Sequence, residues 1–375
     1  MKRIYQLNIA RLAHSLIVVA LLVYFLIVLQ DILMPLAFAA ILAFLLRPLS
    51  GFFDGFIKNQ ILSALCTIIT AITPIFLLLI FFFWQFVGVF ENLPAVSAKL
   101  KSGILIFIQS VGHKLDIPSF SLESWLGDNL STFLEAPIAL LGSSISSSTL
   151  VIGNFFLVLL FTLFFLLYRK AFKQFFLLQF EPKMRSDAKD TLMEIQQVVQ
   201  NYLLGVLTVI IILSVLNSLA LYLIGIKYAW FWGLLAAFLA IIPYVGTFIG
   251  GLLPFVYAIA STGTWWQPAA VAALFLVIQF IEGNFITPKV VGESVKINPF
   301  FAIISLIVGG MLWGIAGIVL ALPGMAILRI ILKQIPIFMP ISALLSSELY
   351  KDADLFEEKF DSEKYRIASF FKFRN

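Results

Sequence analysis

The chain has 375 residues, of which 61% are hydrophobic and 12% charged, and its formal net charge is +5. Soluble domains carry about 25% charged residues, and the mean hydropathy of this chain is +1.04. Such a composition excludes an ordinary soluble protein and predicts an integral membrane protein, with the lipid bilayer as its first partner. The basic residues lie at the ends of apolar runs and form no stripe, which argues against a nucleic-acid partner.

The first apolar run, 12–29, is too long and uniform for the core of a signal peptide and lacks a small-residue cleavage site, so we expect it to be retained. With 32–46 it predicts a hairpin of two spans, hinged near Gln30-Asp31. A spanning helix needs about 20 apolar residues. Further spans are expected at 61–84, 150–168, 203–224 and 268–281.

These runs predict an all-α fold, a polytopic transmembrane helical bundle with about six full spans and two interrupted or re-entrant helical hairpins. We divide the chain into four parts. They are the first three transmembrane helices (1–90), an extracytoplasmic amphipathic helical insertion (91–149), a membrane transport core (150–342) and a charged cytoplasmic tail (343–375). The core includes a cytoplasmic linker helix, 186–202, that runs directly into the fifth span.

Lys and Arg in short connections orient membrane helices, because they are retained on the cytoplasmic side. They gather before the first span and after the fourth, whereas 91–149 carries more acidic than basic residues. The pattern predicts a cytoplasmic amino terminus and, with an even number of crossings, a cytoplasmic carboxyl terminus. The apolar stripe of the outer insertion suits either packing at the membrane surface or a contact between subunits.

The first interrupted run, 228–261, breaks at Ile242-Pro243-Tyr244-Val245-Gly246 and continues through Gly250, Gly251 and Pro254. Backbone freed by Pro and Gly inside a bilayer must be buried in protein or line a watery cavity. The break therefore predicts either a transport cavity or a tight hairpin between two ordinary spans.

The second interrupted run, 299–333, contains Gly309, Gly310, Gly314, Gly317 and Pro323. Its length fits either one strongly tilted helix or a re-entrant pair folded at its glycines. Pro288 and Gly292 are expected to shape the turn that leads into this unit.

Charges inside a bilayer are costly and usually functional. Glu282 is the candidate, because beside Gln279 and Asn284 it could bind a cation or carry a proton, although it lies close to the predicted membrane boundary. Asn201 and Asn217 either join helices by hydrogen bonds or contact a polar solute. The freed backbone from Pro243 and Tyr244 to Gly251 could hold a small hydroxylated ligand.

The sequence shows no signature of a catalytic or metal-binding site. There is one cysteine, Cys66, and the two histidines, His14 and His113, are far apart. We find no phosphate-binding loop, nucleophile elbow or metal-binding helix signature. The sequence therefore predicts no enzyme, no cofactor and no metal site.

Two separate blocks of the chain combine glycines, prolines and polar residues in a fixed order. The first block runs from Glu194 through Tyr202 and Gly225 to Ile242-Pro243-Tyr244-Val245-Gly246 and Gly250. The second comprises 284–292, Asn298-Pro299, Gly309-Gly310, 314–317 and Leu322-Pro323. Together they resemble the signatures of the autoinducer-2 exporter-like permeases, a bacterial inner-membrane family. Arg47-Pro48 departs from the family pattern, where an uncharged residue is expected before the proline. We interpret Arg47 as a topological anchor in preference to a substrate contact.

The resemblance implies secondary transport without an ATP-binding domain, and export of autoinducer-2. It also implies assembly into a homo-oligomeric ring, with the hairpins moving as the transport unit. Family members have been linked to exchange of sodium or lithium against protons. The expected function is thus export of a small polar solute, with a sodium(lithium)/proton antiporter and a non-transporting membrane scaffold as alternatives.

Overall fold

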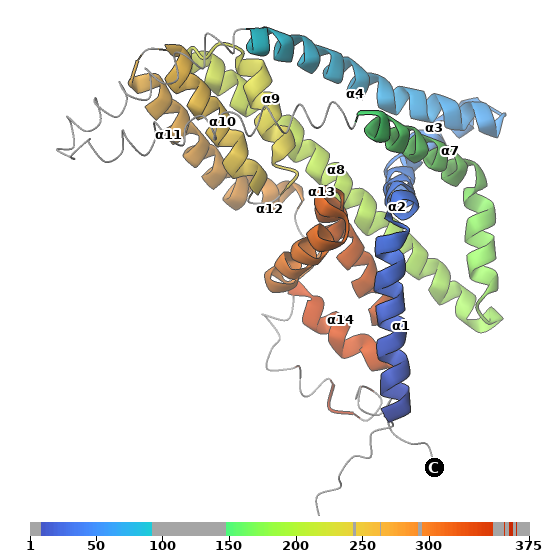
Figure 1. Cartoon of the computed structure of the whole chain (residues 1–375). Helices are drawn as coiled ribbons and strands as arrows, with labels where there is room; N and C mark the ends of the chain where they lie inside the picture. Colours follow the sequence, from blue (N-terminus) through green and yellow to red (C-terminus); the bar gives the residue numbers. More distant parts are fainter. Residues whose placement is uncertain are drawn as a thin grey trace, which may run out of the picture. The chain divides into compact units, whose positions relative to one another are not determined.

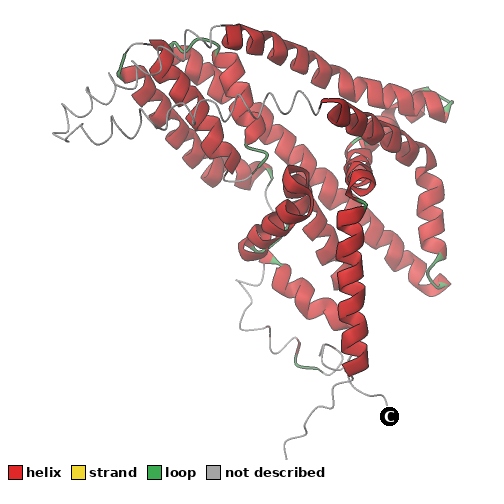
Figure 2. Cartoon of the chain, viewed as in Figure 1, coloured by secondary structure: helices red, strands yellow, loops and turns green. Residues whose placement is uncertain are grey.

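The structure is a computed structural model that describes residues 9–91, 148–242, 245–262, 264–291 and 295–347, together with 356, 360–362 and 365. The outer insertion, most of the tail and three candidate residues, Pro243, Tyr244 and Gly292, lie outside the described residues. Within the described part the chain is helical and contains no strand; a single isolated bridge pairs Ile297 with Ser346 (Figure 2). The predicted all-α class is therefore confirmed.

The chain divides into two compact units. The first comprises Met1–Ile68, Asn154–Leu204 and Glu293–Asn375, and the second comprises Ile69–Gly153 and Gly205–Gly292. Three long helices each run from one unit into the other: α4 (Gln60–Glu91), α7 (Ser148–Leu178) and α8 (Arg185–Ile224).

Five helices among the described residues are long and apolar enough to cross a membrane, and a bent pair raises the number to six. The five segments are Gln60–Val89, Ile152–Leu178, Pro182–Ile224, Trp266–Val290 and Pro299–Lys333. The last is counted by its total length and is broken at Trp313 and Gly314. This agrees with the predicted polytopic bundle. The expected linker helix 186–202 belongs to α8, which continues without a break over 40 residues.

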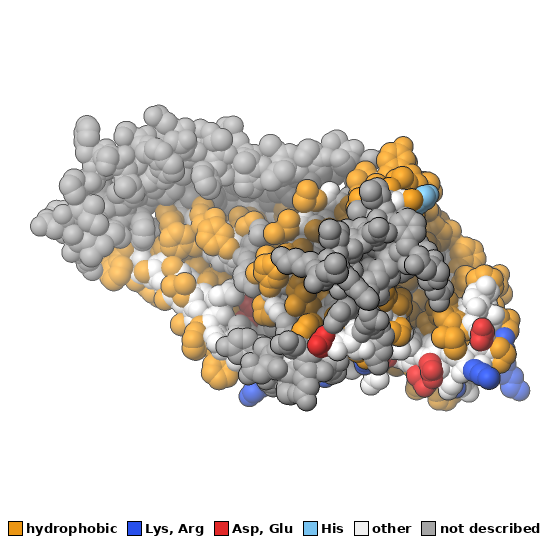
Figure 3. Space-filling view, turned by 90° about the horizontal axis from the view of Figure 1, so that it is seen from below, with side chains coloured by type: hydrophobic (Ala, Val, Ile, Leu, Met, Phe, Trp, Pro, Cys, Tyr) orange, Lys and Arg blue, Asp and Glu red, His pale blue; other side chains and the backbone are white. Residues whose placement is uncertain are grey.

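The surface of these helices is apolar on several sides at once. On the first helix Leu16, Ile17, Val18 and Val19 follow one another, and each side chain is more than half exposed. Among the described side chains visible in Figure 3, apolar ones predominate and charged ones lie mainly toward the lower edge. Because a helix in water hides its apolar stripe, a helix that is apolar all round requires lipid or protein around it.

The two amino-terminal helices differ from the predicted hairpin. Helices α1 (Ile9–Val28) and α2 (Gln30–Leu45) are joined at a sharp bend: Ala13–Val28 and Gln30–Leu45 meet at 89° and together form a broken span or a re-entrant loop. A single residue, Leu29, separates the helices, and the hydrogen bonds from Leu29 N to Phe25 O and from Leu33 N to Leu29 O bridge the bend. An antiparallel hairpin of two full spans needs a loop of about two to five residues, so this junction is not the predicted hairpin.

In the second unit the helices α9 (Ala229–Leu239), α10 (Val245–Thr262) and α11 (Trp266–Ile281) pack side by side (Figure 1). Helices α9 and α10 are both short, and the chain folds back between them, so the first interrupted hairpin is confirmed. Their buried core contains Leu221, Phe231, Trp232, Tyr257 and Val271. The rings of Trp232 and Tyr257 lie 5.0 Å apart, which fixes α9 against α10.

After α11 the chain forms a π-helical turn, Glu282–Ile286, and then the short helix α12 (Thr287–Val290). Pro288 lies in α12, which continues the helical segment Trp266–Val290 directly from the π-helical turn. Pro254 is fully buried inside α10.

In the first unit, α13 (Pro299–Lys333) is folded back on itself, as its path in Figure 1 shows. The backbone leaves helical geometry at Trp313 (φ −134°, ψ 21°) and Gly314 (φ 59°, ψ −137°). Gly309 and Gly317 then meet across the fold, because a Cβ added to Gly317 would lie 1.9 Å from Gly309 O. The second interrupted run is therefore a helical hairpin and not one tilted helix.

Three contacts fix this hairpin within its unit. The indole Nε1 of Trp313 donates to Leu26 O at 2.9 Å, which attaches the apex to α1. Arg329 Nη1 donates to Lys296 O at 3.0 Å, and Lys333 Nζ lies 3.6 Å from Glu194 Oε1 on α8. Gly310 packs on Ile318, and Pro323 is fully buried in the second arm.

Candidate functional site

A small, partly open pocket lies among four helices of the second unit. Its lining comprises Leu213, Asn217, Ala236, Ala240, Thr247, Phe275, Ile278, Gln279 and Glu282. Leu213 and Asn217 on α8, and Phe275 and Gln279 on α11, are four residues apart and so share a helix face. The short side chains of Ala236 and Ala240 on α9 leave the space open.

Asn217 is the most deeply buried polar residue of this pocket, with 3% of its surface exposed. Its side-chain oxygen Oδ1 has no hydrogen-bond partner among the described residues. A buried acceptor that is left unpaired costs about 1–3 kcal/mol. Such a group can accept a hydrogen bond from a hydroxyl, an amine or an amide of a ligand, or can contribute an oxygen to a cation.

Glu282 brings a carboxylate to the same pocket from the end of α11. The hydroxyl of Thr287 donates to its Oε1 at 3.3 Å. Glu282 opens the π-helical turn, a local widening of the helix that is frequent at functional sites. Gln279, one turn earlier, adds an amide, so that an amide, a carboxylate and the hydroxyl-bearing Thr247 surround a space otherwise lined by apolar side chains.

The structure brings together three of the residues proposed from the sequence, Asn217, Gln279 and Glu282. It does not bring Asn284 or Asn201 to them. Asn284 is exposed, and its Nδ2 donates to Phe280 O at 2.8 Å on its own helix. Asn201 is also exposed and belongs to the other compact unit.

The glycines proposed for the pathway lie at helix contacts. A Cβ on Gly246 would come within 1.5 Å of Leu239 O, and one on Gly250 within 2.9 Å of Ala236 Cα. Gly251 contacts the ring of Phe275, where an added Cβ would lie 3.0 Å from Cγ. Within the described residues these three glycines therefore allow α9, α10 and α11 to approach closely, and none of them lines the pocket.

Sequence reasoning missed Thr247 and the small residues of α9. Thr247 directly follows Gly246, the last residue of the predicted break, so its position as the third residue of α10 could have drawn attention to it. Ala236 and Ala240 are four residues apart and thus share a helix face, but an alanine pair in an apolar run carries no signal of a pocket.

Comparison with known proteins relates most of the chain to membrane transporters. A family model described as "AI-2E family transporter" matches residues 16–337. "Putative transport protein YrrI" of Bacillus subtilis (strain 168) is 34% identical over 132 residues, which cover 35% of this chain and 37% of YrrI. "AI-2 transport protein TqsA" of Escherichia coli (strain K12) is 29% identical over 148 residues, covering 40% of this chain and 43% of TqsA.

A longer match joins the chain to "Putative transport protein YueF" of Bacillus subtilis (strain 168), with 23% identity over 328 residues. That match covers 81% of this chain and 84% of YueF. By contrast, the chain spans less than half the length of YrrI and of TqsA.

Proposed function

The chain belongs to the AI-2E family of transporters, and on that premise we propose that it exports a small polar solute by secondary transport. The single observation that carries the proposal is the unpaired Oδ1 of Asn217, buried in a pocket that also holds a carboxylate. A neutral hydroxylated solute can donate one hydrogen bond to Asn217 and another to Glu282. These two hydrogen bonds replace the hydrogen bonds to water that the solute loses when it enters the apolar surroundings.

Autoinducer-2 is the first candidate solute. It is a small, hydroxylated molecule, and the relative TqsA is named as an AI-2 transport protein. In this proposal the hairpin of α9 and α10 forms one wall of the solute site through Ala236, Ala240 and Thr247. Movement of that hairpin relative to α8 and α11 opens the site to one side of the membrane at a time.

The proposal places the chain in a bacterial inner membrane, with both termini in the cytoplasm, as a homo-oligomer. The location of the termini rests on the basic residues before α1 and after the apolar part of α7. The oligomer rests on the family resemblance together with the exposed apolar surface.

Transport of labelled solute into everted membrane vesicles tests the proposed function. Vesicles with the wild-type chain are expected to accumulate labelled autoinducer-2 faster than vesicles without it, and an excess of unlabelled solute should abolish the difference. Glu282→Gln should retain part of the flux, because its amide still offers hydrogen bonds. Equal uptake with and without a correctly inserted chain would contradict export of this solute and would favour the scaffold alternative if no other solute moved.

A second candidate function, a sodium(lithium)/proton antiporter, is favoured by the carboxylate of Glu282 in the same pocket as Asn217. Carboxylate and amide oxygens are suitable ligands for a small hard cation. A pH-sensitive dye in everted vesicles should then report proton movement on addition of sodium or lithium, and Glu282→Gln should abolish the signal. A cation-dependent signal that survives this substitution would exclude Glu282 as the coupling group.

A further inference from the structure

The first unit contains a cluster of polar side chains where two long helices and a short connecting helix meet. The cluster is far in sequence from the solute pocket. The short helix is α3 (Arg47–Phe56), and it contributes Arg47, Ser50 and Asp54. The start of α4 contributes Ser63, and α7 contributes Arg169. We call these side chains and the neighbouring Lys170 the basic corner.

Asp54 has both of its oxygens engaged in the basic corner. Its Oδ1 accepts a hydrogen bond from Ser63 Oγ at 2.8 Å, and its Oδ2 accepts from Arg169 Nη2. Arg47 Nη1 lies 4.0 Å from the same Oδ2. Arg169 Nη1 also donates to Ser50 Oγ at 2.9 Å and to Leu166 O at 3.3 Å. The Arg169 guanidinium is therefore held in one position before any ligand arrives.

The positive charges of the corner exceed its negative charge. Arg47, Arg169 and Lys170 carry three positive charges, and Asp54 is the only acidic partner that the described residues offer them. Burial, and then the like charge of Arg169, lower the pKa of Arg47, while Asp54 opposes both effects. Lys170 has no hydrogen bond or ion pair with any described residue. An anion at this corner would balance the excess charge.

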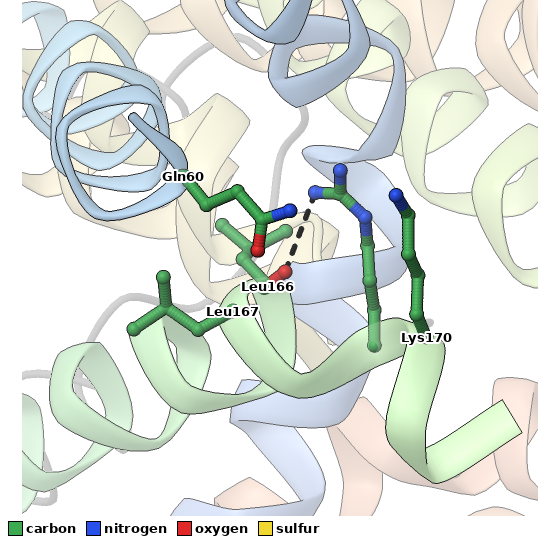
Figure 4. Close-up of a pocket in the computed structure, with 5 residues that line it drawn as sticks. Gln60, Leu166, Leu167 and Lys170 are labelled. Atoms are coloured by element: carbon green, nitrogen blue, oxygen red, sulfur yellow. Dashed lines mark hydrogen bonds between the residues drawn. The ribbon is translucent and has the colours of Figure 1, made fainter. Parts of the chain in front are cut away.

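The corner borders a small, partly open pocket lined by Gln60, Leu166, Leu167, Arg169 and Lys170. In Figure 4 the side chains of Gln60, from α4, and Lys170, from α7, extend to the same side of α7. A guanidinium, an ammonium and an amide thus supply hydrogen-bond donors to one space. Guanidinium and ammonium groups together are the usual partners of phosphate oxygens.

We propose that this pocket binds an anionic phosphate group, and that the phosphate is carried by a membrane lipid. The lipid source follows from the surroundings, because the same helices carry exposed apolar side chains next to the pocket residues in sequence. Ile61 and Leu62 follow Gln60, and Tyr168 and Phe172 flank Arg169 and Lys170; all four are at least half exposed. A phospholipid can place its headgroup at the basic residues and its chains along this apolar surface.

Binding can be measured on the purified full chain by its thermal unfolding in detergent with added lipid. The wild type should unfold at a higher temperature with phosphatidylglycerol than with phosphatidylcholine. Lys170→Gln should weaken the apparent affinity for phosphatidylglycerol about fivefold, as expected for one Lys near an anionic headgroup. Lys183→Gln is the matched control, because it removes the same charge from an exposed position outside the pocket, and it should leave the affinity within twofold of the wild type.

A second experiment uses inorganic phosphate alone, and it distinguishes a lipid headgroup from free phosphate as the source of the anion. Stabilisation by phosphatidylglycerol but not by millimolar phosphate supports a lipid ligand. Equal stabilisation by both, lost in Lys170→Gln, would keep the phosphate site and overturn the lipid source. Equal weakening by Lys170→Gln and Lys183→Gln would overturn the site, since general attraction to an anionic surface would then explain the binding. None of these three outcomes depends on which solute the second unit transports.

Discussion

Asn217 combines two properties that a purely structural amide seldom has. It is almost completely buried, and its Oδ1 lacks a partner within the described part of the chain. Amides that join membrane helices form hydrogen bonds with neighbouring helices, whereas Oδ1 of Asn217 borders a pocket. An unpaired acceptor costs stability, and binding of a hydrogen-bond donor would recover that cost. This is the physical reason for placing the solute at Asn217.

The positive φ of Gly314 leads to a prediction about backbone strain at a single residue. Its φ of 59° lies in the left-handed region, and an added Cβ would meet no atom within 4 Å. Gly314→Ala should therefore lower the stability by about 1–3 kcal/mol through backbone strain alone, measured as a lower temperature of thermal unfolding in detergent. Gly324→Ala, at another position with free space but with φ in the ordinary range, should have no such effect. Equal stability of both variants would contradict the strained apex.

At the scale of single elements, Gly246 determines how closely α10 follows α9. A Cβ there would overlap Leu239 O, at 1.5 Å, and this atom belongs to the backbone and cannot rotate away. Gly246→Ala should destabilise the second unit by at least the roughly 1–3 kcal/mol typical of overpacking. Gly283→Ala, where a Cβ would meet nothing within 4 Å, is the control for thermal unfolding. If Gly246→Ala were as stable as the wild type, the close approach of α9 and α10 would be wrong.

The fold of α13 predicts a crosslink between its two arms. Gly310 and Ile318 are in contact, with an added Cβ of Gly310 lying 3.3 Å from Ile318 Cγ1. In a straight helix eight residues span about 12 Å, which is too far for a disulfide. With Cys66 replaced by Ser, the variant Gly310→Cys/Ile318→Cys should lose both free thiols on mild oxidation.

Loss of the two thiols can be followed by mass after alkylation, at a protein concentration low enough to exclude crosslinks between chains. Gly310→Cys paired with Leu328→Cys serves as the control, since Leu328 is exposed on the second arm and has no atom within 4 Å of a Cβ placed on Gly310. Two thiols that remained reactive in the 310/318 pair would favour the tilted helix.

The helices could be predicted from the sequence because each is an apolar run of the length that a bilayer requires. The prediction failed where one residue decided the geometry: Leu29 produces a bend, while the polar Gln30-Asp31 pair suggested a reversal. The sequence left α13 open between one helix and two. Its glycines permit close approach, but only the left-handed backbone of Gly314 commits the chain to folding back.

At the scale of the whole molecule, the site was predicted in part. Asn217, Gln279 and Glu282 could be proposed because polar side chains within apolar runs are rare. Asn201 could not be separated from Asn217 by the same argument, since both are amides on α8, and only burial distinguishes them. The apolar lining from α9 was invisible because it depends on which helix faces pack together.

The orientation of the chain in the membrane gives a further prediction. Lys and Arg gather before α1 and near the end of α7. Both regions lie on the cytoplasmic side when the bent pair α1–α2 is a re-entrant loop and α4 and α7 are the two crossings between them. A reporter enzyme that is active only in the cytoplasm should then be active when fused to either terminus. A reporter active only outside should be inactive at both. Activity of the outside reporter at one terminus alone would require an odd number of crossings and would refute the proposed topology.

The most direct test of the solute site is the flux of labelled autoinducer-2 through Asn217→Leu in everted vesicles. This substitution removes an unpaired buried amide, so the variant should unfold at a temperature equal to or above that of the wild type. Its flux should nevertheless fall at least about fivefold, because a lost hydrogen bond to a buried ligand group costs about 1–3 kcal/mol. Asn201→Leu on the same helix should keep the wild-type flux. Wild-type flux through a stable Asn217→Leu chain would contradict the assignment of this pocket to transport.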